Sequence, residues 1–287
     1  MKNDTKQKIV DMVLKKMEET KQTPWDSGFI ACREEPVNLA TGKAYRGVNS
    51  FTLRAFGCGA NEYVTFKQAV KLGGKVRKGE HGLPVIWYTM WNKTQRRPAN
   101  ADDDETDEII PYMRSATVFE VSQCDGLESK CLSEPRGNVR QNDRIDKWFD
   151  TFRTATKLTV EHTLQNASYS PTLHTISIRN IDEYNTDDTY YQTLMHEAVH
   201  STGKHMGRSE FKKWGDHAYS EEEVVAEMGS LFLCDHFGII KSQIDNSSVY
   251  INHWSQKLRE NPNWLFKGVK DAEKAYDYML KTGGEED

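Results

Sequence analysis

The sequence predicts an α+β protein in which a small mixed α+β domain precedes a mostly helical domain. Strand-like alternation and Gly-containing turns fill the front part, whereas helical spacing predominates from residue 141 onward. The charge divides in the same way. Residues 1–98 carry 18 Lys and Arg against 9 Asp and Glu, so with a net charge of −5 the remainder carries −14. We therefore predict domains at 1–125 and 141–287, joined by a linker at 126–140.

The composition excludes several classes of protein. With 37% hydrophobic residues the chain can bury cores, which excludes wholesale disorder. The apolar runs span only a few residues, whereas a membrane helix needs about 20, so we expect no membrane contact. The N-terminus is charged and unlike a signal peptide. Five cysteines without a CxxC motif argue against a disulfide framework and fit a reducing cytoplasm.

Local patterns predict the elements of the front domain. Residues 5–19 have an apolar stripe at helical spacing, and residues 23–50 are broken by Gly and Pro into loops and short strands. Thr65 can cap a short helix at 66–72, which Gly73-Gly74 ends. A hairpin at 75–82, a strand at 83–91, an acidic loop at 100–108 and a strand at 112–122 follow.

The back domain reads mainly as helices. The pattern predicts a helix at 143–158, short strands at 159–162 and 175–179, a helix from Asp187 or Asp188 to Gly203, a helix at 220–237, and final helices at 248–260 and 271–281.

The helix predicted from Asp187 or Asp188 to Gly203 carries an HExxH motif, formed by His196, Glu197 and His200. Residues four apart lie on one helix face, so both imidazoles can bind the same ion, and neutral histidine is a good zinc ligand. Glu197 is then placed to act as general base toward a water molecule. The motif favours a metallopeptidase over a surface helix with two incidental histidines.

A catalytic zinc ion needs a third protein ligand, and the sequence offers several. The extended HExxHxxGxxH pattern has Gly203 but ends on Met206, with His205 one position short. A second source is the loop with Asp216 and His217. A third is the acidic pair Glu223 and Glu227, which resembles the arrangement of thermolysin-like gluzincins.

The acidic pair can be interpreted in two ways. By the gluzincin resemblance, Glu223 binds the metal and Glu227 orients a histidine. Alternatively, Ser220 and Glu223 form a capping box, and Glu227 becomes the ligand. We favour Glu223. Just before this helix, Tyr219 or His217 could stabilise an oxyanion, and Tyr219 is our second candidate catalytic residue beside Glu197.

Basic residues alternate with aromatic rings in the front domain, which is typical of single-stranded nucleic-acid binding. Arg46, Lys75, Arg77 and Lys78 are the favoured DNA-binding residues, because Gly-flanked basic turns are exposed. We expect Phe51, Phe66 and Trp87 to be core residues instead. The other rings of this region are Tyr45, Phe56, Tyr63, Tyr88 and Trp91.

Both halves together resemble the ArdC-type antirestriction proteins. In the back half the resemblance rests on the HExxH segment 193–203 and on 222–233, and in the front half on Pro24-Trp25, on segments 38–49 and 68–82, and on 118–127. It covers about residues 20–281. One departure is Lys204, which stands where the family commonly has histidine.

The resemblance implies a domain that binds single-stranded DNA, followed by a zincin-like metallopeptidase domain of gluzincin type. It implies a metalloprotease site for Zn²⁺ and a bacterial cytoplasmic protein encoded on a mobile element that protects incoming DNA from host restriction. Mn²⁺ could occupy the same site, because nitrogen and oxygen ligands accept either ion and availability decides. A protein substrate or a restriction enzyme would be the other partner. The alternatives are a non-catalytic protein that coats single-stranded DNA and whose metal site is structural, and a housekeeping peptidase without DNA affinity.

Overall fold

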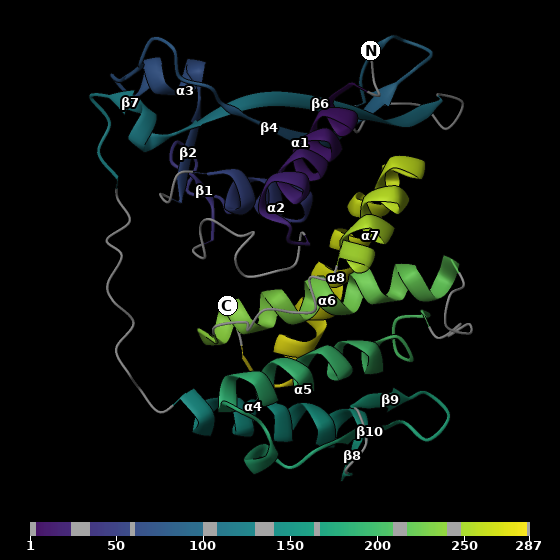
Figure 1. Ribbon diagram of the computed structural model, residues 1–287. Helices are drawn as coiled ribbons and strands as arrows, with labels where there is room; N and C mark the ends of the chain where they lie inside the picture. Colours follow the sequence, from purple (N-terminus) through teal and green to yellow (C-terminus); the bar gives the residue numbers. More distant parts are fainter. Residues whose placement is uncertain are drawn as a thin grey trace. The chain divides into compact units, whose positions relative to one another are not determined.

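A computed structural model describes the chain over residues 4–23, 35–57, 61–99, 108–129, 141–163, 167–208, 217–239 and 248–285. The side chains of 4, 141–142, 217–220, 248–251 and 253 are not described. It divides into two compact units (Figure 1). One comprises Met1–Met12 and Glu34–Leu132, and the other Val13–Arg33 and Ser133–Asp287. The predicted linker stays a prediction, because residues 130–140 lie outside the described part.

The front unit is rich in strands. In chain order it contains the start of α1 (Asp4–Thr20), then β1 (Val37–Asn38), α2 (Val48–Phe56), β2 (Glu62–Thr65), α3 (Phe66–Lys71), β3 (Lys75–Val76), β4 (Leu83–Asn92), β5 (Arg97–Pro98), β6 (Ile109–Glu120), the 3₁₀ turn η1 (Val121–Gln123) and β7 (Cys124–Asp125).

A five-stranded sheet with the order β1-β2-β6-β4-β5 organises this unit. Strands β4 and β6 pair antiparallel from Leu83↔Val118 to Asn92↔Ile109. Strand β2 pairs with β6 only at its end, from Val118 to Glu120, and β5 pairs with β4 only at Trp91 and Asn92. The middle of β4 and β6 is therefore a two-stranded ribbon, visible as the long teal and blue pair in Figure 1.

Successive residues of β2 build two cores on opposite faces of the sheet. Tyr63 packs with Leu53 of α2, Val85 and Val118. Its neighbour Val64 packs with Ala69 of α3, Val76 and Cys124. Helix α3 begins at the predicted cap, where Thr65 and Gln68 form a capping box.

The structure corrects several sequence predictions for this unit. The hairpin at 75–82 is wrong, because β3 pairs with β7 and β4 with β6. Helix α2 and strand β2 were not predicted. Phe51 is buried as expected, but Phe66 is 56% exposed at the start of α3. Trp87 is 42% exposed because it lies in the two-stranded ribbon.

The back unit is mostly helical. It contains α4 (Gln141–Thr156), β8 (Thr159–His162), β9 (Ser168–Ser170), β10 (Thr175–Ile178), the 3₁₀ turn η2 (Ile181–Glu183), α5 (Asp187–Thr202), α6 (His217–Phe237), α7 (Ser248–Glu260) and α8 (Asn263–Thr282). Its last helix begins at Asn263 rather than the predicted 271, and β9 was not predicted. Among the described helices, none is long and apolar enough to cross a bilayer.

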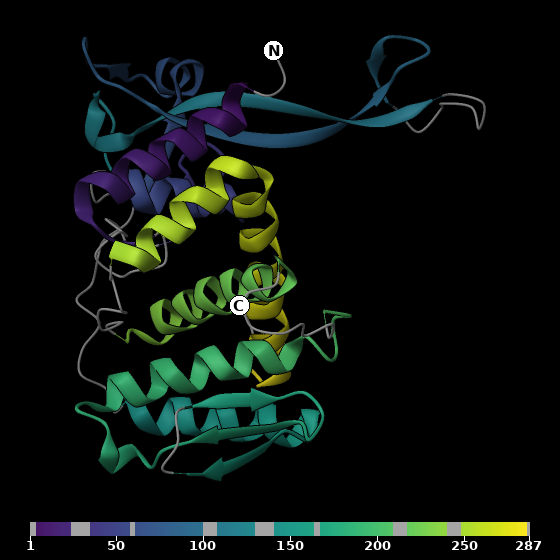
Figure 2. The same ribbon diagram turned by 45° about the vertical axis from the view of Figure 1, so that its right-hand side comes forward.

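A three-stranded sheet supports the helices. Its order is β8-β10-β9, with β8 parallel and β9 antiparallel to the central strand β10. Figure 2 shows α5 lying over this sheet, with α6 on the other side of α5. Ile176 and Ile178 of β10 are fully buried, and so are Ala198 and Val199 of α5.

Two glycines set the close approach of the helices. A Cβ atom at Gly229 of α6 would lie 2.9 Å from Cγ1 of Val199 on α5. A Cβ atom at Gly268 of α8 would lie 2.3 Å from Cγ1 of Val224 on α6. Both separations are shorter than side-chain contacts allow, so only glycine lets α6 pack this tightly between α5 and α8.

We expect Gly229→Val to destabilise the protein by about 1–3 kcal/mol, because the stiff Val199 side chain cannot move aside. Urea unfolding of the intact chain measures this. In a Val199→Ala background the same change should be milder, since the opposing methyl groups are gone. Equal losses in both backgrounds would show that the contact does not set the helix spacing.

Candidate metal centre

Helix α5 presents the HExxH motif from a well-capped start. The side chain of Thr186 accepts a hydrogen bond from the backbone N–H of Thr189, and Asp187 and Asp188 lie in the first turn, where negative charge stabilises a helix. The helix ends at Thr202, as predicted to within a residue. His196 and His200 therefore lie on one face, one turn apart.

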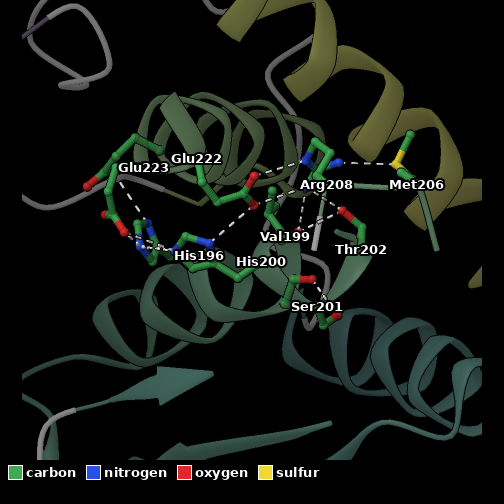
Figure 3. Close-up of polar contacts among 11 residues, drawn as sticks. His196, Val199, His200, Ser201, Thr202, Met206, Arg208, Glu222 and Glu223 are labelled. Carbon is green, nitrogen blue, oxygen red and sulfur yellow. Dashed lines mark hydrogen bonds and ion pairs between the residues drawn. The ribbon is translucent and has the colours of Figure 1, made fainter. Parts of the chain in front are cut away.

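The two histidines and Glu223 of α6 converge on one point (Figure 3). The Nε2 atoms of His196 and His200 are 3.2 Å apart. The carboxylate of Glu223 places Oε2 3.7 Å from Nε2 of His196 and Oε1 3.4 Å from Nε2 of His200. All three ligand atoms lie within 4.8 Å of one another.

The opposite ring nitrogens also face carboxylates. Nδ1 of His200 is 3.3 Å from Oε1 of Glu222, and Nδ1 of His196 is 3.8 Å from Oε2 of Glu227. A ligand histidine normally bonds through its second nitrogen to such a group, which fixes the ring and its tautomer. Glu223 therefore lies at the Nε2 atoms of both histidines, whereas Glu227 lies at the opposite nitrogen of His196.

The acidic surroundings favour positive charge at this point. Burial lowers the pKa of His200, but its contacts with the carboxylates of Glu222 and Glu223 outweigh burial and raise that pKa to about 10. Two nitrogens and an oxygen suit Zn²⁺, and Mn²⁺ accepts the same donors. Nitrogens bound to one tetrahedral zinc ion lie about 3.3 Å apart, close to the Nε2 separation. The residues therefore fit a divalent cation.

Glu197 lies beside this cluster, buried on α5 directly after His196. Tyr184, which the sequence analysis missed, lies near it. Burial raises the pKa of the Tyr184 hydroxyl, and the charge of Glu197 adds to this, whereas a hydrogen bond with Thr193 and contacts with Arg179 oppose it. Tyr184 directly follows the 3₁₀ turn η2, and no sequence pattern singled it out.

The other candidates for the third ligand do not join the cluster among the described residues. His205 instead stacks on Tyr278, with ring centroids 5.8 Å apart. Met206 contacts Arg208 through its sulfur atom. Asp216 and the side chains of His217 and Tyr219 lie outside the described residues, so the proposed role of Tyr219 stays a prediction.

The four predicted DNA-binding residues lie in the front unit and are all exposed. Lys75 belongs to β3, and Lys78 to the turn that follows. Arg77 donates hydrogen bonds to the Glu80 carboxylate at 3.1 and 2.8 Å, so part of its charge is neutralised. Arg46 lies just before α2.

Two further residues contact the metal centre without having been predicted. Glu222 was passed over because its neighbour Glu223 has the gluzincin spacing. Arg208 lies in the segment after α5, where no motif marks it, and its guanidinium reaches Glu222 at 3.1 Å.

Helices α5 and α6, which carry the metal centre, are typical of one class of protein. A family model described as zincin-like metallopeptidase matches residues 147–271, which include α5 and α6. A second model, the N-terminal domain of anti-restriction factor ArdC, matches residues 3–119. The fold and site are thus those of a zincin-like domain that follows an ArdC N-terminal domain.

Solved structures agree over the whole chain. The antirestriction protein ArdC from plasmid R388, in its metal-free structure, is 28% identical with a TM-score of 0.76, and 99% of each chain is covered. Its Mn(II)-bound structure gives a TM-score of 0.75 at 28% identity, covering 98% of this chain and 99% of that one. The chain belongs to the ArdC-type antirestriction proteins.

Curated relatives include longer proteins. Two DNA primases TraC of Escherichia coli are 30% and 31% identical over 90% of this chain, which spans only 25% and 18% of their lengths. The uncharacterised protein y4eC of Sinorhizobium fredii is 30% identical over 85% of this chain and 80% of its own length.

We expect Glu223→Gln to weaken Zn²⁺ or Mn²⁺ binding by more than about 100-fold, because a ligand oxygen is lost. Glu227→Gln should stay within the about 10–100-fold range of residues that orient a ligand. Calorimetric titration of the intact protein measures both, with the exposed Glu260→Gln as control. A larger loss of metal affinity in Glu227→Gln than in Glu223→Gln would make Glu227 the ligand.

Proposed function

We propose that this protein binds single-stranded DNA with its front unit and cleaves peptide bonds at the His196–His200–Glu223 centre, and so protects incoming mobile DNA from host restriction. The observation that carries this proposal is the three-residue centre with Glu197 beside it, in a chain whose other unit is an ArdC N-terminal domain. The peptide substrate would be a protein of the recipient cell, such as a component of its restriction system.

In the proposed reaction a bound divalent cation supplies Lewis-acid chemistry, polarising the substrate carbonyl and lowering the pKa of water to about 7 in the case of zinc. Glu197 accepts the proton of the attacking water and later delivers it to the departing amine nitrogen. Its burial excludes bulk water, which strengthens the electrostatic interactions of its carboxylate.

The number of ligands favours catalysis over a structural role for the metal. Structural zinc sites are closed by four protein ligands, whereas catalytic sites keep a position for water or substrate. Within the described part of the chain the cluster offers three ligand residues. The side chains of His196 and Glu223 are 19% and 20% exposed, which leaves the centre accessible from one side.

The exposed basic residues support DNA binding by the front unit. Lys75 and Lys78 can contact phosphates without first breaking an ion pair such as the one Arg77 forms with Glu80. Lys67 and Lys71 lie exposed on the neighbouring α3, next to the exposed ring of Phe66. Exposed cations beside an exposed ring are the elements of a single-strand surface.

The two-stranded ribbon offers a second set of rings. Trp87 lies directly opposite Arg114 in the ladder, so the indole and the guanidinium share a face. On the same face Trp91 and Tyr112 pack with ring centroids 5.5 Å apart. Exposed aromatic residues beside an arginine can stack on unpaired bases.

The relatives act in related contexts. The TraC proteins are DNA primases, and the ArdC protein of known structure comes from a plasmid. The first name supports a role for this chain on DNA, and the second supports an origin on a plasmid. Coating of single-stranded DNA with a purely structural metal remains the second candidate, and Glu197 separates the two.

We expect Glu197→Gln to abolish peptidase activity and protection from restriction, while metal and DNA binding persist, because Glu197 is no ligand. Transfer of unmodified DNA into a restricting host measures protection, and metal content is the control. Full protection by this variant would favour the coating function.

Single-strand affinity should fall steeply with salt. Lys75→Ala or Lys78→Ala should reduce the slope of log K against log salt by about 0.7 each, whereas Trp87→Ala should cost about 1–3 kcal/mol with little change in slope. Fluorescence anisotropy with an oligothymidylate measures both, and Lys204→Ala in the back unit is the control. Equal binding of the wild type and all three variants would exclude these residues.

A further inference from the structure

Glu222 connects the metal centre to a group outside it. Its carboxylate is buried, with Oε1 3.3 Å from Nδ1 of His200. The same carboxylate accepts hydrogen bonds from Arg208, from Nε to Oε2 at 3.1 Å and from Nη2 to Oε1 at 3.2 Å. Figure 3 shows Glu222 lying between His200 and Arg208. One carboxylate thus receives a two-point contact on one side and a histidine on the other.

Arg208 is itself fixed to the end of α5. Its Nη2 atom donates to the Val199 carbonyl at 3.2 Å and to Oγ1 of Thr202 at 2.9 Å. The last carbonyls of a helix lack a backbone donor, and the Val199 carbonyl accepts from Oγ1 of Thr202 at 2.6 Å as well as from the guanidinium. Arg208 therefore joins the helix that carries the ligand histidine to the carboxylate that faces it.

The turn after α5 brings Arg208 back to this position. The N–H of Arg208 donates to the Gly203 carbonyl at 2.8 Å, which closes the turn. Gly207 adopts φ +70°, a left-handed conformation that other residues rarely take. The returning chain places the arginine beside the last turn of α5.

We propose that Glu222 and Arg208 are a positioning pair for the metal centre. The Glu222 carboxylate accepts the proton on Nδ1 of His200, which leaves the lone pair of Nε2 directed at the cation. Arg208 balances the charge of the buried carboxylate and holds it in place through the end of α5. The inference rests on the metal centre and not on the proposed peptidase or DNA-binding activity.

Glu221, the acidic residue next to Glu222, has different partners and provides a control. Glu221, one position earlier on α6, accepts a hydrogen bond from Nε1 of Trp264 at 2.8 Å and also pairs with Lys267. Glu221 contacts α8, whereas Glu222 contacts α5. A Glu221→Gln variant therefore removes a neighbouring carboxylate and its own ion pair while leaving the histidine contacts unchanged.

The first experiment measures Zn²⁺ affinity of the intact chain by competition with a chromophoric chelator. Glu222→Gln should bind zinc about 10–100-fold more weakly, as is typical when the partner of a ligand histidine is removed. Arg208→Met should weaken binding by a smaller factor, and Glu221→Gln should stay within about twofold of wild type. Wild-type affinity in Glu222→Gln would overturn the proposal.

A double variant distinguishes positioning from a purely structural role. Glu222→Met with Arg208→Met removes both charges and keeps the volume, a replacement that often preserves stability. We expect this variant to unfold at about the wild-type urea concentration and yet to bind zinc at least about tenfold more weakly. Recovery of wild-type affinity in a stable double variant would show that only the uncompensated charge mattered.

The tautomer gives a readout that does not depend on affinity. In the zinc-loaded wild type, ¹⁵N-edited NMR of the histidine rings should show a slowly exchanging proton on Nδ1 of His200. That signal should broaden or disappear in Glu222→Gln and persist in Glu221→Gln. A wild-type His200 without a proton on Nδ1 would contradict the pair even if the double variant failed to fold.

Discussion

The close packing of α5 against α6 is the constraint on which the metal centre depends. Two histidines on one helix supply only one side of a site, and the third ligand must come from another element. The contact between Gly229 and Val199 lets the helix backbones approach, and six residues earlier on α6 Glu223 then faces His196 and His200. Gly268 lets α8 support α6 from its other side in the same way.

Charge and packing act together at this point. Three glutamates of one helix, Glu222, Glu223 and Glu227, face the two histidines, which would be costly without compensating positive charge. Without a metal, protonation of His200 supplies positive charge, which is why its pKa is raised. A divalent cation would supply more positive charge at the same point. The same carboxylates that make the centre attract a cation therefore also orient its ligands. Arg208 offsets part of the cost of gathering them, and a divalent cation would offset more.

The candidate binding residues of the two units lie on different kinds of secondary structure. In the front unit, rings and cations lie on exposed strands and turns, where a flexible polymer can reach them. In the back unit, the reactive groups lie on buried helices, whose backbone cannot shift without disturbing the core. The proposed function uses both properties, because DNA of any sequence must be bound while a particular peptide bond is positioned.

The sequence alone determined the class of the protein and the core of its site. Periodicity predicted α5 and α6 to within a few residues, and helical spacing placed His196 and His200 on one face, because such relations are local. Other features depend on residues distant in the chain, so only the tertiary structure supplied them. They are the ladder partners of β3 and β4, the exposure of Trp87, and the positions of Glu223 and Glu227 relative to the two histidines. Arg208 and Glu222 belong to the same group, since no spacing relates a turn after one helix to a carboxylate on the next.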